Sequence, residues 1–423
     1  MRINLIHLIL VAASIIATDV IGQDRAYVSS IIDSLCAPRY HGRGYVNDGD
    51  TKAARFIVRE LKRLNEEAKT ELLPFNLEVN TFPGDMKVSI NDHVLIPGSD
   101  YIIDPKSGGI SGEFEAVHFK SKWAKSKEYL FNQISKGRFE NKVVVLDTRT
   151  KNAEYAQIIA DVYSNPLKAE AYILLTDKKL TWSVSRAQLD FPVFHITASS
   201  TPKKIKRVNL NVDQKFEADY TALNVMTTIK GTGDTAKKSI VYTAHLDHLG
   251  RMGTETYIAG ASDNASGSAM LLDLYQHYIA NPTEQDVVFI WFGGEEAGLV
   301  GSRHFVEDAP IALDRIQFLL NLDLMGDAGK GITAVNGKVF DQHFAKLSSL
   351  NMELGLLEKV KARGPAANSD HHPFYEKGVP CFFIYTMGDY THYHDIYDVP
   401  ENLPLAKYDE VFQLVTAFME NGI

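Results

Sequence analysis

One histidine and four acidic residues recur between residues 241 and 326, each beside a short apolar run or a glycine-rich turn. They are His245 in VYTAHLDHLG, Asp263 in GASDNASG, Glu295 and Glu296 in FGGEEAGLVGS, and Asp323 in LLNLDLMG. Their spacing is that of successive strand–helix units, whose strand ends meet at one edge of a sheet. Because zinc takes imidazole nitrogens and carboxylate oxygens as ligands, the pattern predicts a metal site.

A pair of metal ions in such a site would suit the hydrolysis of an amide. At neutral pH that reaction needs a nucleophilic hydroxide, an electrophile for the carbonyl oxygen, and a group that accepts a proton and returns it. Two zinc ions about 3.5–4 Å apart, bridged by one carboxylate, supply the first two, and a free carboxylate supplies the third. The stretch lacks only a second histidine, and the C-terminal segment YHDIYD offers His394.

Apolar runs and helical periodicity indicate an α/β fold around these residues. Buried strands are predicted over 239–245, 287–292, 318–324 and 381–386, and helices over 26–35, 51–64, 265–279 and 407–419, with Thr51 as an N-cap. Strands that are apolar throughout are covered on both faces. We therefore expect a mixed, mostly parallel central sheet with helices on both faces, and His245 and Asp323 at the carboxyl ends of strands.

A glycine-rich loop over residues 40–50 (YHGRGYVNDGD) carries His41 and Arg43. Both side chains could enter the site. A role in bracing the loop or on the surface is the favoured interpretation.

The chain begins with an apolar segment that has the features of a secretory signal. Arg2 precedes an apolar core over residues 5–16, and small residues follow up to Gly22. This core is too short to span a bilayer comfortably, so residues 1–22 are predicted to be a cleaved signal peptide, with an uncleaved amphipathic anchor as the alternative. We expect an exported protein, periplasmic or extracellular, without stable membrane association after cleavage.

The charge and cysteine content of the chain limit the classes of partner and of metal ligand. With 44 basic and 53 acidic residues, the net charge of −9 gives no electrostatic case for binding nucleic acid or an anionic membrane. The expected partner is a peptide substrate, and the oligomeric state stays open. Cys36 and Cys381 are the only cysteines, so cysteine does not supply the metal ligands. Two buried free thiols are favoured over a single bridge between them.

Residues 112–212 are predicted to be an insertion in the catalytic domain, which would then comprise residues 23–111 and 213–423. The segments KVVVLD, AYILLTD and FPVFHITAS follow one another there, without a cluster of metal ligands. In this order they resemble a protease-associated domain, a smaller β-rich unit. The resemblance implies a lid or a substrate-guiding role, and a purely structural insertion is the alternative.

The motifs HLD, SDNASG, EE followed by GLVGS, and NLD, with a late histidine, together resemble the co-catalytic dizinc aminopeptidases of clan MH. These are relatives of glutamate carboxypeptidases and glutaminyl cyclases. The resemblance implies the zinc exopeptidase fold and two zinc ions per chain. It implies that Asp263 is the bridging ligand, that His245 and Asp323 bind one zinc ion, and that Glu296 and His394 bind the other.

The resemblance also implies roles for residues that do not bind metal. Glu295 would be the general base that takes a proton from the bridging water and returns it to the leaving amine, and Asp247 would orient the imidazole of His245. A cis peptide is implied after the bridging aspartate. Asp370 and His371 match a segment near the family's substrate pocket, where substrate contact and loop bracing are both open.

His394 is preferred to His392 as the last ligand. In the family the terminal histidine is followed by an aspartate four positions later, as His394 is by Asp398. The family usually has Thr or Ser directly after that histidine, and Asp395 is a departure from this pattern.

The implied function is that of an exported, metal-dependent aminopeptidase that removes N-terminal residues from peptides. A carboxypeptidase on the same two zinc ions is one alternative, and it would need a cation such as Arg303 or Arg363 to hold the substrate carboxylate. A glutaminyl cyclase is disfavoured by the intact NASG and the complete ligand set. A metal-free binding protein is disfavoured because all six positions are chemically intact.

Overall fold

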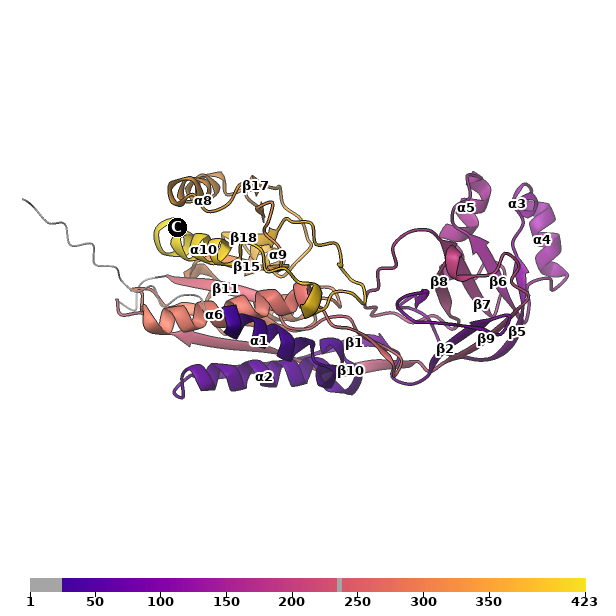
Figure 1. The fold of residues 1–423 in the computed structure, drawn as a ribbon, viewed down its shortest axis with the longest axis horizontal. Coiled ribbons are helices and arrows are strands. Elements are labelled where there is room, and N and C mark those ends of the chain that lie inside the picture. The colour runs from indigo at the N-terminus through magenta and orange to yellow at the C-terminus, as the bar shows by residue number, and fades with distance from the viewer. Residues whose placement is uncertain (1–24, 234–237) are drawn as a thin grey trace, which may run out of the picture.

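The computed structural model describes residues 25–233 and 238–423, which form two lobes (Figure 1). The predicted signal peptide lies outside these residues. Among the helices that are described, none is long and apolar enough to cross a membrane.

The first lobe, which we call the catalytic lobe, is built on an eight-stranded sheet in the order β1-β10-β14-β11-β15-β18-β16-β17. The strands are β1 (Thr70–Thr81), β10 (Lys215–Ile229), β14 (Val287–Phe292), β11 (Ser239–His245), β15 (Ile316–Leu322), β18 (Cys381–Thr386), β16 (Ile332–Val335) and β17 (Val360–Ala362). The four central strands, β14, β11, β15 and β18, run parallel to one another. Antiparallel pairings join β1 to β10, β10 to β14 and β16 to β18, which confirms the mixed, mostly parallel sheet.

Helices cover both faces of this sheet, as predicted. One face packs against α1 (Arg25–Cys36), α2 (Gly49–Leu64), α6 (Gly267–Ala280), α8 (Asp341–Leu354) and α10 (Tyr408–Asn421). The other face packs against α7 (Val300–Glu307) and α9 (His371–Glu376). On β11, Ile240 and Tyr242 point to the first core and Val241 to the second, so the strand is buried on both sides. Helix α2 begins at Gly49 after Asp48, so the predicted N-cap at Thr51 is wrong.

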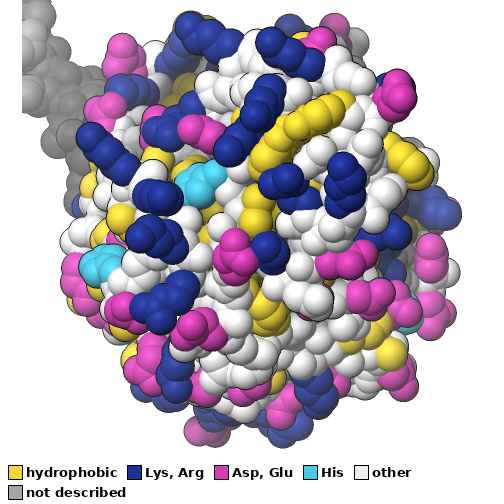
Figure 2. All heavy atoms as spheres, turned by 90° about the vertical axis from the view of Figure 1, so that its right-hand side faces the viewer, with side chains coloured by type: hydrophobic (Ala, Val, Ile, Leu, Met, Phe, Trp, Pro, Cys, Tyr) yellow, Lys and Arg dark blue, Asp and Glu magenta, His cyan; other side chains and the backbone are white. Residues whose placement is uncertain are grey.

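The second lobe has its own eight-stranded sheet, in the order β3-β2-β9-β5-β6-β7-β8-β4. Its strands are β2 (Met86–Ile90), β3 (His93–Leu95), β4 (Tyr101–Ile103), β5 (Ile110–His118), β6 (Lys142–Asp147), β7 (Ala171–Thr176), β8 (Val193–Thr197) and β9 (Arg207–Val212), with helices α3 (Ser121–Ala124), α4 (Lys127–Ser135) and α5 (Ala153–Ala160). Figure 2 shows acidic and basic side chains interspersed over the far end of this lobe.

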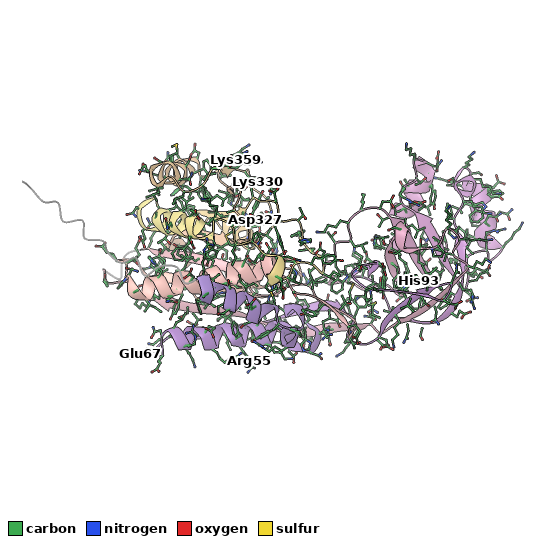
Figure 3. The ribbon with its side chains drawn as sticks, in the orientation of Figure 1. Arg55, Glu67, His93, Asp327, Lys330 and Lys359 are labelled. Atoms are coloured by element: carbon green, nitrogen blue, oxygen red, sulfur yellow. The ribbon has the colours of Figure 1, made fainter. Side chains whose placement is uncertain are left out.

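The predicted start of the insertion at residue 112 is too late. Strand β2 pairs with β9 and strand β4 pairs with β8, so residues 86–103 belong to the second sheet. His93, labelled in Figure 3, lies in this lobe. The sequence placed these residues with their neighbours along the chain, whereas their hydrogen-bond partners come from residues 194–212. Strand β9 ends at Val212, which is the predicted end of the insertion.

Two features connect the lobes. The long strands β1 and β10 pair from Thr70 with Thr227 to Thr81 with Lys215 and carry the chain from one lobe to the other (Figure 1). An apolar cluster then joins side chains from both lobes, including Phe82, Leu180, Trp182, Leu249 and Met252. The two cysteines, Cys36 and Cys381, are buried free thiols, as predicted.

Candidate metal centre

The topology of the catalytic sheet brings the predicted residues together. His245 is the last residue of β11, Glu295 and Glu296 follow β14, and Asp323 follows β15. Strands β14, β11 and β15 are adjacent and parallel, so these side chains meet beyond one edge of the sheet. Asp263 lies on an irregular helical turn over Ala261–Ser266.

Asp263 stands at the middle of the cluster. Its Oδ1 lies 3.3 Å from Nε2 of His245, and its Oδ2 lies 3.0 Å from Nε2 of His394. His245 Nε2 is also 3.4 Å from Asp323 Oδ1, and His394 Nε2 is 3.5 Å from Glu296 Oε1. The two oxygens of one carboxylate therefore face two different histidines, each of which has a second carboxylate beside it.

His248 is a member of the cluster that the sequence analysis missed. Its Nδ1 lies 2.8 Å from Glu296 Oε1, and its buried Nε2 makes no hydrogen bond within the described chain. The sequence did contain an indication of this role, because His248 directly follows the HLD motif.

The donor set fits metal ions. Two groups have ligand atoms that all lie within 4.8 Å of one another, namely His245, Glu295 and Asp323, and His248, Asp263 and Glu296. Asp323 Oδ1 is buried and accepts no hydrogen bond from the described protein. Carboxylates buried at this density are costly without a compensating cation, and an orphaned ligand oxygen is one that a cation would satisfy.

The adjacent side chains of Glu295 and Glu296 have pKa values that are shifted in opposite directions. Burial raises the pKa of Glu295 well above its ordinary value, and the carboxylates of Asp370 and Glu296 raise it further. Burial also acts to raise the pKa of Glu296, but His394 and His248 outweigh it and lower that pKa to about 2. Glu296 therefore belongs to the charged part of the cluster, while Glu295 holds a proton more readily.

Asp247 contacts His245 through its backbone rather than through its carboxylate. Its Oδ1 is 3.8 Å from His245 Nδ1, beyond hydrogen-bond distance, and the histidine bonds instead to the backbone carbonyl of Asp247 at 3.1 Å. The carboxylate accepts the backbone N–H groups of Glu295 at 3.1 Å and Glu296 at 3.3 Å, and the Tyr45 hydroxyl. Asp247 thus positions the glutamate pair with its side chain and His245 with its backbone.

The turn that carries Asp263 is held from two sides. Asp398 accepts the backbone N–H groups of Ser262 at 2.8 Å and Asp263 at 3.1 Å. The buried guanidinium of Arg43 donates to five backbone carbonyls, those of Leu35, Leu246, Ala259, Gly260 and Asp263. Loop bracing by Arg43, the favoured interpretation, is confirmed. The peptide between Asp263 and Asn264 is cis, as the resemblance implied.

A cavity of about 260 Å³ opens onto the cluster. Besides the ligand candidates and Glu295, it is lined by Leu324, Arg363, Asn368, Phe383, Tyr385 and Tyr393. Asp370 and His371 are fully buried and are not among the lining residues, and the substrate contact considered for them stays a prediction. Burial raises the pKa of Asp370 to about 7.

The cluster and its place beyond the strand ends define a candidate two-metal centre in an α/β protein. Residues 224–419, which carry every member of the cluster, match the model of peptidase family M28. This match agrees with the resemblance seen in the sequence.

Two curated relatives and two solved structures illustrate the similarity. A probable leucine aminopeptidase of Trichophyton verrucosum is 29% identical over 223 residues, which is 49% of this chain and 57% of that protein. Aminopeptidase YwaD of Bacillus subtilis is 26% identical over 270 residues, 60% of this chain and 57% of that protein. The chain thus spans little more than half the length of these relatives.

The solved structures extend over both lobes. The zinc aminopeptidase BSAP of Bacillus subtilis is 18% identical with a TM-score of 0.67, covering 93% of each chain. An aminopeptidase from Aneurinibacillus is 20% identical with a TM-score of 0.62, covering 95% of this chain and 94% of that chain. These structures share the overall fold.

Arg43 offers a test of how the site is held. In Arg43→Met five buried carbonyls lose the guanidinium donor, although that of Gly260 keeps the backbone N–H of Ala265. Each unsatisfied buried acceptor costs about 1–3 kcal/mol, so we expect a loss of at least about 3 kcal/mol in unfolding free energy. Urea unfolding measures it. Arg55→Met on the exposed side of α2, labelled in Figure 3, is the control and should change stability by less than about 0.5 kcal/mol. Equal effects of the two substitutions would contradict the bracing role.

Proposed function

We propose that the protein is an aminopeptidase that uses two zinc ions per chain. His245 and Asp323 would hold one ion, and Glu296 and His394 would hold the other. Asp263 would bind both ions. The observation that carries this assignment is the position of Asp263, whose two oxygens lie 3.3 Å and 3.0 Å from the Nε2 atoms of His245 and His394. When bound, zinc supplies a Lewis acid for the scissile carbonyl and lowers the pKa of a water.

Within this proposal the chain's own contribution to the chemistry is proton transfer by Glu295. The side chain lines the cavity beside His245 and Asp323, where a carboxylate can accept a proton from a water molecule and give it back. Its backbone N–H is fixed by Asp247, so the carboxylate is held at the strand end. The proton taken from the attacking water would pass to the leaving amine.

Two features support a preference for a free N-terminus. The cavity wall is rich in carboxylates, which attract the ammonium group of a substrate. The curated relatives are aminopeptidases by name. Export through residues 1–22 is part of the proposal and rests on the sequence of that segment alone.

A carboxypeptidase is the second candidate, and one observation favours it. Arg363 lines the cavity, where a guanidinium could bind the carboxylate of a substrate. Arg303, the other cation considered, is not a lining residue and pairs with Glu376 at 3.6 Å. Arg363 is therefore the residue that distinguishes the two exopeptidase activities.

The adjacent glutamates should respond differently to the same substitution. We expect Glu295→Gln to lower kcat by about 10²–10⁴-fold with both zinc ions retained, because only the proton acceptor is lost. Glu296→Gln should instead weaken the binding of one zinc ion. Zinc analysis and hydrolysis of dipeptides with a free N-terminus, run on the same samples, measure both. Full activity in Glu295→Gln would contradict the assigned role.

Arg363→Met tests the second candidate. If the protein is an aminopeptidase, kcat/KM should change less than about twofold for dipeptides with an amidated C-terminus and a free N-terminus, since no substrate carboxylate is present. A carboxypeptidase should cleave N-blocked substrates and lose about tenfold or more in Arg363→Met, because a hydrogen bond between charged groups contributes about 1.5–3 kcal/mol. Arg303→Met is the matched control.

A further inference from the structure

The loop over residues 387–399, which we call the His394 loop, is held by both lobes. At its start, Asp327 of the catalytic lobe accepts the backbone N–H groups of Asp389 at 2.8 Å and Tyr390 at 3.0 Å, and Lys330 pairs with the Asp389 carboxylate. Asp327 and Lys330 are labelled in Figure 3. Further along, the loop meets residues 177–192, which join β7 to β8 in the second lobe.

Trp182 of the second lobe pairs with His394 through two backbone contacts. The Trp182 N–H donates to the His394 carbonyl at 2.9 Å, and the Trp182 carbonyl lies 3.0 Å from the ring Nδ1 of His394. A carbonyl can only accept, so Nδ1 carries the proton and Nε2 is free to face Asp263 and Glu296. The Trp182 indole is itself fixed by donating to the Ile103 carbonyl at 2.8 Å.

Lys179 makes three contacts with the same loop. Its ammonium group donates to the carbonyls of Thr391 at 2.5 Å and Tyr393 at 2.9 Å, and it pairs with Asp395 at 2.8 Å. These acceptors lie on both sides of His394 along the chain. Three donors therefore meet three acceptors, which is the full capacity of an ammonium group.

The conformation that these contacts hold is an unfavourable one. His394 has a φ of 57°, in the left-handed region that residues other than glycine seldom adopt. Such a conformation persists only where the surroundings determine it. The Tyr393 ring stacks on the His394 ring at 3.7 Å between centroids and lines the substrate cavity.

We infer that Lys179 and the Trp182 peptide are positioning groups of the second lobe that hold His394 as a metal ligand. The inference rests on the proposed two-zinc site. Both residues lie outside 224–419, the segment that matches the family, so one ligand of the catalytic lobe depends on a loop of the other lobe. The second lobe thereby controls the occupancy of one metal position.

Zinc binding by Lys179 variants tests this inference. In Lys179→Met the His394 loop loses its three contacts, so we expect the affinity for one of the two zinc ions to fall about tenfold while the other is unchanged. Lys179→Arg keeps the charge and should give an intermediate affinity. Lys178→Met, at the exposed neighbouring position, should bind zinc as the wild type does. Competition with a chelator of known affinity measures both sites, and the melting temperature is recorded without metal.

The possible results separate the inference from the proposal on which it rests. Equal affinities for both ions in Lys179→Met and wild type would contradict the inference alone. Equal weakening of both sites with a lowered metal-free melting temperature would also contradict it, because that is general destabilisation. A wild-type protein that binds fewer than two zinc ions would contradict the proposed site itself.

Discussion

The concentration of negative charge beyond one edge of the catalytic sheet is the constraint on which the rest of the site depends. Four carboxylates, those of Asp263, Glu295, Glu296 and Asp323, lie close together with the imidazoles of His245, His248 and His394, and a cavity opens onto this cluster. Charges at this spacing repel one another unless cations or protons compensate them. In the proposed site, cations bound between these carboxylates would compensate the charge, and Glu295 would be the carboxylate that takes up protons.

Such a site needs ligands that cannot relax away from each other, and backbone groups provide this rigidity. Arg43 ties together five carbonyls around the turn of Asp263, Asp398 holds the N–H groups of that turn, and Asp247 holds those of the two glutamates. Each of these charged side chains is buried and bonded to main chain. Buried charges used in this way keep the ligand atoms in place before any metal binds.

The parts of this arrangement that could be predicted were those encoded locally. Apolar runs that end at or just before His245, Glu295 or Asp323 give both a strand and a site residue beyond its end, so the sheet and most of the cluster followed from the sequence. Contacts between distant segments could not be predicted in the same way. The pairing of β2 with β9 and the bonds between Trp182 and His394 join residues more than a hundred positions apart, without a local pattern.

The central claim is that Asp263 lies between two metal ions. Anomalous diffraction at the zinc absorption edge, from crystals of the wild-type protein grown with zinc, tests it most directly. We expect two peaks, one between His245 and Asp323 and one between Glu296 and His394, each within bonding distance of a different oxygen of Asp263. A single peak, or a second ion bound by His248 in place of His394, would contradict the account.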